Sequence, residues 1–124
     1  MAGLSTYGEA LVLNALLTGC YVSAHTGDPG NTGASEVAGG SYARVALGAY
    51  SIATGNPSIA DNDAIVEHPT STADWGTITH FGLWTALSGG NFIGGKALDA
   101  SKVILTAYVL RYPAGSIQIS TDDV

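Results

Sequence analysis

The chain has 124 residues, a net charge of −6 and only 11% charged residues. This length predicts one domain, spanning residues 1–124. Many of its apolar residues are alanine, so a single copy has few large side chains from which to build a core. Because small domains with thin cores are marginally stable, the composition favours a protein that assembles with other subunits.

The same composition argues against several classes of function. With four cations and no basic cluster, the chain offers no surface suited to nucleic-acid phosphates. One cysteine allows neither an internal disulfide framework nor a multi-cysteine zinc site. No apolar run approaches the roughly 20 residues that a membrane-spanning helix needs. The first six residues lack the basic region of a secretory signal, so we expect a protein that is made and retained in a cytoplasm.

One helix is predicted, at about residues 6–18. Thr6 and Glu9 have the spacing of a capping box, in which the Thr6 hydroxyl accepts the Glu9 N–H. Gly19 stands where helices commonly end in the left-handed conformation. Between these two signals only Glu9 and Asn14 interrupt the apolar circumference. We therefore expect a helix that is apolar on nearly every side.

An apolar helix of this kind has to be covered on more than one side. Two interpretations stay open: burial against the protein's own sheet, or insertion into a neighbouring subunit. The candidate contact residues on the helix are Leu11, Leu13, Leu16 and Leu17. A closed symmetric homo-oligomer, for instance a trimer, would bury them.

The rest of the chain has the pattern of short strands separated by glycine- and proline-rich turns. Strands are predicted at residues 20–25, 41–51, 64–67, 76–84, 92–93, 103–112 and 116–120. Asp61-Asn62-Asp63 is interpreted as a polar turn, and Gly94-Gly95 as the interruption of a strand. Strands spaced by about 8–12 residues predict a mainly β fold. We expect an antiparallel β-sandwich, jelly-roll or immunoglobulin-like, with one N-terminal helix.

Metal ligands are not indicated by the spacing of the relevant residues. His25, His68 and His80 lie on three different predicted elements and match no zinc motif. Residues 61–63 with Glu67 resemble an alternating array of oxygen ligands, but they lack the glycine and the length of a calcium loop. We expect no metal and no cofactor.

Catalytic motifs are equally weak. There is no G-x-S-x-G sequence, and Cys20 has no nearby partner, so we interpret it as a small buried apolar residue. Ten acidic residues provide carboxylate pairs by chance, without the signature of a deep cleft. We expect a protein that is not an enzyme.

The aromatic residues concentrate in the strongest strand region. Trp75, Trp84, Phe81 and Phe92 are predicted to form the core. Trp75 stands at a strand entrance beside Asp74, a setting that also suits a carbohydrate-binding module. That alternative requires Trp75 or Trp84 to stand exposed in a groove beside an Asp or Asn.

A series of short motifs runs through nearly the whole chain. They are Ala24-His25-Thr26-Gly27-Asp28-Pro29, Glu36-Val37, Gly39-Gly40-Ser41-Tyr42-Ala43-Arg44, Asp74-Trp75-Gly76-Thr77-Ile78-Thr79-His80-Phe81-Gly82-Leu83-Trp84, Ser88-Gly89-Gly90-Asn91, residues 95–102 and Leu110-Arg111-Tyr112-Pro113-Ala114-Gly115. In this order they resemble a family of small tailed-bacteriophage virion proteins, described as tail-fibre-like or decoration proteins.

This resemblance implies a structural role in a virion, without known catalysis, for a protein assembled in the bacterial host cytoplasm. We expect an accessory subunit that decorates or cements the capsid. A tail- or fibre-associated subunit and a receptor- or carbohydrate-binding module are the alternatives. The expected partners are further copies of the chain and the major capsid or tail proteins, through many weak contacts that gain by avidity.

Four motif residues, Arg44, Trp75, His80 and Trp84, are expected to be structural. Arg44 is one of four cations, so we expect it to pair with a carboxylate or to bind loop carbonyls. Gly76, Gly82 and Gly95 suit bulges or a close approach of strands. The chain departs from the family in Leu105-Thr106-Ala107-Tyr108, where a polar, glycine-containing turn is usual. Either a turn forms there without glycine, or the strand is continuous and Tyr108 faces a partner.

Overall fold

Nine strands and one helix make up residues 3–121, the part of the chain that the computed structural model describes. In chain order they are α1 (Thr6–Leu17), β1 (Tyr21–His25), β2 (Val45–Ala46), β3 (Tyr50–Ala53), β4 (Ile59–Asn62), β5 (Val66–Glu67), β6 (Gly76–Trp84), β7 (Phe92–Ile104), β8 (Arg111–Tyr112) and β9 (Gln118–Ser120).

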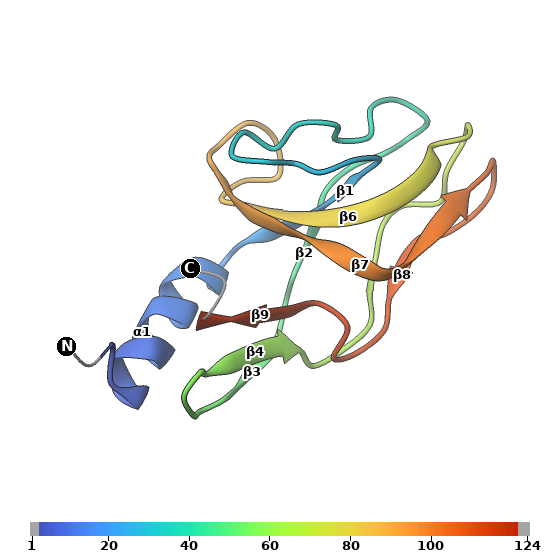
Figure 1. Cartoon of the computed structure of the whole chain (residues 1–124). Helices are drawn as coiled ribbons and strands as arrows, with labels where there is room; N and C mark the ends of the chain where they lie inside the picture. The colour runs from blue at the N-terminus through green and yellow to red at the C-terminus, as the bar shows by residue number, and fades with distance from the viewer. Residues whose placement is uncertain (1–2, 122–124) are drawn as a thin grey trace.

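The strands form antiparallel sheets of four, three and two strands, with the orders β2-β1-β6-β7, β3-β4-β9 and β5-β8. The four-stranded sheet lies above the three-stranded sheet, and α1 packs at one end beside β9 (Figure 1). The prediction of a mainly β, antiparallel, sandwich-like fold with an N-terminal helix is confirmed.

The start of α1 differs from the predicted capping box. Ser5, not Thr6, is the N-cap, and its hydroxyl accepts the Gly8 N–H at 3.1 Å. The Glu9 carboxylate turns inward and accepts the buried backbone N–H of Ser58 at 2.8 Å. A buried N–H depends on a protein acceptor, whereas water can serve an exposed helix end, so the tertiary contact outweighs the local one.

Two predictions for the middle of the chain are also wrong, one of a strand and one of a turn. The segment 41–51 is not one strand, because Gly48 at φ +74° separates β2 from β3. The predicted polar turn at 61–63 is largely strand β4, in which Asn62 is buried. The Asn62 amide donates to the carbonyls of Ala64 and Pro113, so its polar side chain can be buried at the end of β4, the central strand of the three-stranded sheet.

Strand β7 runs straight through the glycines that were predicted to interrupt it. Gly94 and Gly95 pair with Leu83 and Gly82 of β6. A Cβ on Gly95 would lie 2.5 Å from Cγ of Pro29, so glycine is required there by the loop that crosses the sheet. The predicted close approach at Gly95 is therefore confirmed, while the predicted interruption is not.

The connection between β7 and β8 is a turn built without glycine. Ala107 adopts φ +68°, which costs a non-glycine residue about 1–2 kcal/mol. Ser71 supports this turn: its hydroxyl donates to the Leu105 carbonyl at 2.5 Å and accepts the Tyr108 N–H at 3.0 Å. Tyr108 is also 48% exposed, so the turn forms without glycine and still presents this side chain outward.

The core lies between the two larger sheets and is centred on β1 and β6. Its fully buried members include Val22, Ile78, Phe81 and Leu83. The predicted strand 76–84 coincides with β6, and Ile117 points inward beside exposed Gln118, as predicted. Strand-favouring residues such as Ile78 and Phe81 located β6, and the alternation of apolar and polar residues located the inward Ile117.

Candidate functional site

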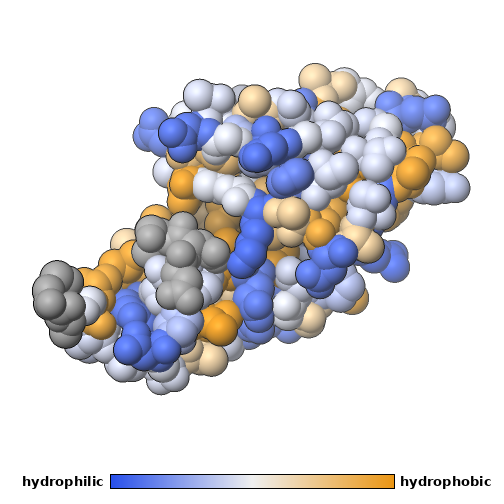
Figure 2. Space-filling view, in the orientation of Figure 1, coloured by the Kyte–Doolittle hydropathy of each residue, from blue (hydrophilic) through white to orange (hydrophobic). Residues whose placement is uncertain are grey.

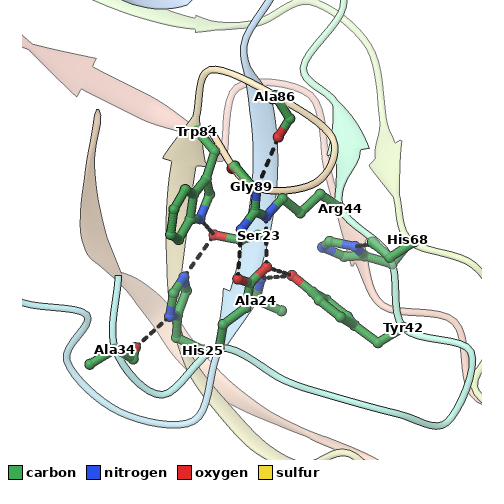
Figure 3. A network of polar contacts seen from close by, with 12 residues as sticks. Ser23, Ala24, His25, Ala34, Tyr42, Arg44, His68, Trp84, Ala86 and Gly89 are labelled. Atoms are coloured by element: carbon green, nitrogen blue, oxygen red, sulfur yellow. Dashed lines mark hydrogen bonds and ion pairs between the residues drawn. The ribbon is translucent and has the colours of Figure 1, made fainter. Parts of the chain in front are cut away.

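A cluster of polar contacts surrounds Arg44, next to β1 and β6 (Figure 3). The guanidinium binds both carboxylate oxygens of Glu36, at 2.9 Å from Nε and 3.0 Å from Nη2. Its Nη1 donates to the carbonyls of Ala86 and Gly89. Both contacts expected of Arg44 are thus present, a carboxylate and two loop carbonyls. The pair is largely shielded, with side-chain exposures of 10% and 19%.

Aromatic side chains enclose this ion pair. The guanidinium carbon of Arg44 lies 3.8 Å from the centre of the Trp84 ring, a cation–π contact. The Tyr42 hydroxyl donates to Glu36 at 2.7 Å and accepts the Ala24 N–H at 3.0 Å. The Tyr42 hydroxyl therefore joins the 25–44 connection, including its ion pair, to strand β1.

A second chain of hydrogen bonds runs from Trp84 through Ser23 to His25. His25 Nδ1 lies 2.7 Å from the carbonyl oxygen of Ala34, so Nδ1 must carry the proton. Nε2 then accepts from the Ser23 hydroxyl at 2.7 Å, and that hydroxyl accepts the Trp84 indole N–H at 3.0 Å. Every member of the chain thus has a complementary partner when His25 is neutral and carries its proton on Nδ1.

Gly82 makes room for this chain. A Cβ at this position of β6 would lie 2.5 Å from the Ser23 hydroxyl and 2.7 Å from Nε2 of His25. The close approach predicted at Gly82 is confirmed, and its cause is a pair of polar side chains on the neighbouring strand β1.

A third polar group joins His68, which follows β5, to Tyr112 of β8. His68 Nδ1 is 2.8 Å from the Ala43 carbonyl, and Nε2 is 2.9 Å from the Tyr112 hydroxyl. Because a carbonyl oxygen can only accept, Nδ1 of His68 donates to Ala43, and Nε2 accepts from the Tyr112 hydroxyl. Tyr42 and Trp75 pack on the His68 ring, so the cluster around Arg44 and the polar group around His68 share one set of packed aromatic rings.

The protonation states follow from burial. Desolvation lowers the pKa of His25 and of His68 below the ordinary value, despite the carbonyl acceptors that favour their charged forms. Burial pushes the pKa of Glu36 upward, but the hydrogen bonds from Arg44 and Tyr42 outweigh it and bring the net pKa below the usual value. The interior thus holds two neutral imidazoles and one ion pair. Burial also raises the pKa of the Cys20 thiol to about 11, in agreement with its predicted apolar role.

Ser23 and His25 have the spacing of a nucleophile and a general base, but their surroundings do not suit catalysis. Both side chains are fully buried. The Ser23 hydroxyl is engaged on both sides, by His25 and Trp84. A reacting group would have to displace the core to reach it. The arrangement is suited to holding β1, β6 and the 25–44 connection together.

No group of three or more His, Cys, Asp or Glu residues within residues 3–121 is placed to hold a metal ion. His25 and His80 are cross-strand neighbours in the β1–β6 pair, while His68 lies apart in the polar group under β8. His80 Nδ1 contacts the Thr79 hydroxyl at 2.8 Å. In the same range, no helix has the length and apolarity to cross a membrane.

The two tryptophans do not form an exposed aromatic platform. Trp75 is 7% exposed and belongs to the core, as predicted, and its indole N–H donates to the Gly40 carbonyl at 3.0 Å. Trp84 is half-buried, and Arg44 covers its ring. Neither meets the condition set above for a carbohydrate-binding module.

The four leucines proposed as contact residues divide between opposite faces of α1. Leu13 and Leu17 are buried in the protein's own core, and so are not available to a partner. Leu16 is half-buried, and Leu11 is 58% exposed. Tyr7, four residues before Leu11, continues its exposed face with an exposure of 76%, and Leu4, which precedes the helix, is 54% exposed. Burial against the protein's own sheet is thus confirmed for Leu13 and Leu17. The opposite face is left uncovered, and its insertion into a neighbouring subunit stays a prediction.

Two comparisons with known proteins bear on what this chain is. The model of the family described as "Podophage GP4 fiber I protein gp80" matches residues 3–120. The chain belongs to this fibre family. A search of curated proteins gave no match. The resemblance to phage virion proteins is thus confirmed at the level of a virion fibre protein.

Within this fibre-family chain, sequence reasoning missed the most specific interior groups. Ser23, Glu36 and Tyr42 are ordinary polar residues of predicted strands and loops, and nothing in their spacing marks them as partners. The one available signal was the position of Glu36 eight residues before Arg44, because a chain with four cations has few choices of ion pair.

Proposed function

We propose that this chain is a non-catalytic structural subunit of a phage fibre, built in the cytoplasm of the bacterial host and carried on the virion. The observation that carries the proposal is the fibre-family match over residues 3–120, nearly the whole described chain. The interior supports it, because Arg44, Glu36, Ser23 and His25 are engaged with one another and with loop carbonyls. Such contacts stabilise a fold without leaving a reactive group open.

The proposal includes association with further copies and with other virion proteins. The uncovered face of α1, with Tyr7 and Leu11, and the exposed Leu4 just before the helix support a contact with another subunit. No charged side chain lies on this face, since Glu9, the single charged residue of α1, is buried. Identical acidic chains can therefore approach one another there with little repulsion. Repetition of a small contact in many copies gives avidity.

Attachment to the capsid surface as a decoration protein, which the sequence led us to expect, is the competing location. The family description favours a fibre, and one experiment separates the two. Purified particles are labelled with a gold-conjugated Fab against this chain and imaged by electron microscopy.

Gold confined to fibres is the expected result. Gold spread evenly over the capsid shell would overturn the fibre assignment in favour of decoration. Particles that bind no Fab, checked by immunoblotting with the purified protein as the positive control, would overturn the virion role.

A further inference from the structure

The end of β7 and the turn between β7 and β8 form an apolar projection at one end of the molecule. Its exposed side chains are Val103 (56%), Leu105 (41%), Tyr108 (48%) and Val109 (37%). No residue from 103 to 110 carries a charge. We call these four residues the knob. Apolar clusters of this kind on a small protein commonly mark an interaction site.

Hydrogen bonds from the segment 71–74 hold the knob in shape. Ser71 bonds Leu105 and Tyr108 through its hydroxyl, and its carbonyl accepts the Ala107 N–H at 2.8 Å. The Asp74 carboxylate accepts the N–H and the hydroxyl of Thr106 at 2.8 and 3.0 Å. The knob is thus ordered before any partner arrives, which lowers the entropy cost of binding.

A concave apolar surface lies at the other end of the molecule, between α1, β7 and β9. Leu16, Leu83, Ile93 and Ile119 line it, with Lys96 as the charged residue among its lining. We call it the groove. Its volume is about 190 Å³. Small-molecule sites usually measure about 300–1,000 Å³, so the groove suits an inserted side chain better than a ligand.

The two surfaces lie at opposite ends of the molecule. In Figure 1 the turn after β7 is at the far right, while α1, β9 and the start of β7 meet at the left. Figure 2 shows apolar side chains at the right-hand end and inside a recess near the helical end. One copy therefore cannot bury its own knob in its own groove.

Charge adds a second element of complementarity. Asp74 is exposed at the base of the knob, and Lys96 lines the groove. A knob entering a groove would bring a carboxylate toward an ammonium group. The apolar surfaces and the charges thus point to the same occupant.

We propose that the knob of one copy docks in the groove of the next copy, with Tyr108 as the inserted side chain and Asp74 facing Lys96. This inference rests on the proposed fibre function and specifies how its subunits join. Because the two surfaces differ, the contact is head-to-tail. Head-to-tail contacts that do not close into a ring produce an open filament.

Two blocking variants test the proposal, Tyr108→Glu in the knob and Ile93→Glu in the groove. Sedimentation velocity over a range of concentrations should show oligomers of increasing size for the unmodified protein and monomers for each variant alone. An equimolar mixture should form dimers and nothing larger, because each pair has one intact knob and one intact groove. Circular dichroism verifies that both variants are folded.

Ile65→Glu is the matched control. Ile65 is 60% exposed between β4 and β5 and belongs neither to the knob nor to the lining of the groove, so this variant should associate like the unmodified protein. A dimer formed by Tyr108→Glu alone would overturn the head-to-tail contact. So would unchanged association of both blocking variants, or a protein that stays monomeric up to about 1 mM.

A double-mutant cycle tests the charge contact without altering the apolar surfaces. Lys96→Glu should weaken association about tenfold in the unmodified protein and clearly less in an Asp74→Asn background. Asp74→Asn retains the oxygen that accepts from Thr106. Additive effects of the two substitutions would overturn the pairing of Asp74 with Lys96. Because these measurements use purified protein, they can fail while the gold labelling of fibres succeeds, and the reverse.

Discussion

The molecule shields polar side chains beside the four-stranded sheet and exposes apolar side chains at its two ends. The interior contains an ion pair, Arg44–Glu36, and a neutral histidine, all of them hydrogen-bonded. The ends expose Tyr7, Leu11 and Tyr108. Within residues 3–121, no buried side-chain nitrogen or oxygen lacks a hydrogen-bond partner.

This contrast separates two tasks. Long loops cannot be held by a thin apolar core, so buried polar bonds attach them: Glu36 belongs to the 25–44 connection, and Arg44 binds the carbonyls at 86 and 89. Apolar side chains at the ends contribute little to the stability of one copy, and are available for contacts between copies. Substitutions of the buried residues should therefore affect folding, and substitutions of the exposed apolar residues at the ends should affect assembly.

The largest effect is expected from Arg44→Ala. It leaves the shielded Glu36 carboxylate without its cation and two loop carbonyls without a donor, which should lower the free energy of unfolding by about 3–5 kcal/mol. Urea denaturation followed by circular dichroism measures the change. Arg111→Ala is the control: its pair with Glu67 is 63% and 49% exposed, so a loss of about 0–1 kcal/mol is expected. Equal losses in the two variants would contradict the assigned role of Arg44.

Two leucines of one helix provide the sharpest internal comparison. Leu13→Ala removes a fully buried side chain and should destabilise the protein by about 2–5 kcal/mol. Leu11→Ala, at a position that is 58% exposed, should stay within about 0.5 kcal/mol. Thermal unfolding of dilute protein distinguishes them. A large loss for Leu11→Ala at low concentration would mean that this face is already covered within one copy.

Gly82→Ala should cost about 1–3 kcal/mol, because its methyl group collides with Ser23 and His25. Gly94→Ala on the adjacent strand is the matched control, since a Cβ there meets nothing within 4 Å. Denaturant midpoints of the two variants give the difference. A stable Gly82→Ala protein would show that the Ser23–His25 contact can be rearranged at little cost.

A smaller effect should accompany mild acid. His25 and His68 have lowered pKa values in the folded protein, so the unfolded chain binds protons first as the pH falls through about 6.5. Stability is therefore fully present above this pH and decreases below it. Denaturant midpoints between pH 7.5 and 5.5 should show the decline, and His68→Asn should make it less steep. An unchanged slope in His68→Asn would mean that His68 does not titrate differently on folding.

Several elements could be located without the tertiary structure. Strand β6 follows from its strand-favouring residues, the inward Ile117 from alternation, and the close approaches at Gly82 and Gly95 from the special position of glycine in strands. The helix could be placed as well, but not its cap, since the choice between Ser5 and Thr6 depends on where Glu9 finds a better partner. Boundaries failed where a side chain serves a distant backbone group, as at Asn62.

By itself, the sequence determined the class of fold, the family and the expectation of assembly, because composition, periodicity and motif order can be read along the chain without knowing which distant residues meet. Only the tertiary structure decided which leucines of α1 lie inside, that the β7–β8 turn projects an ordered knob, and that Ser23, His25 and Trp84 form one chain of hydrogen bonds. Those outcomes depend on which distant groups meet when the sheets pack. A pattern along the chain carries no record of such pairings.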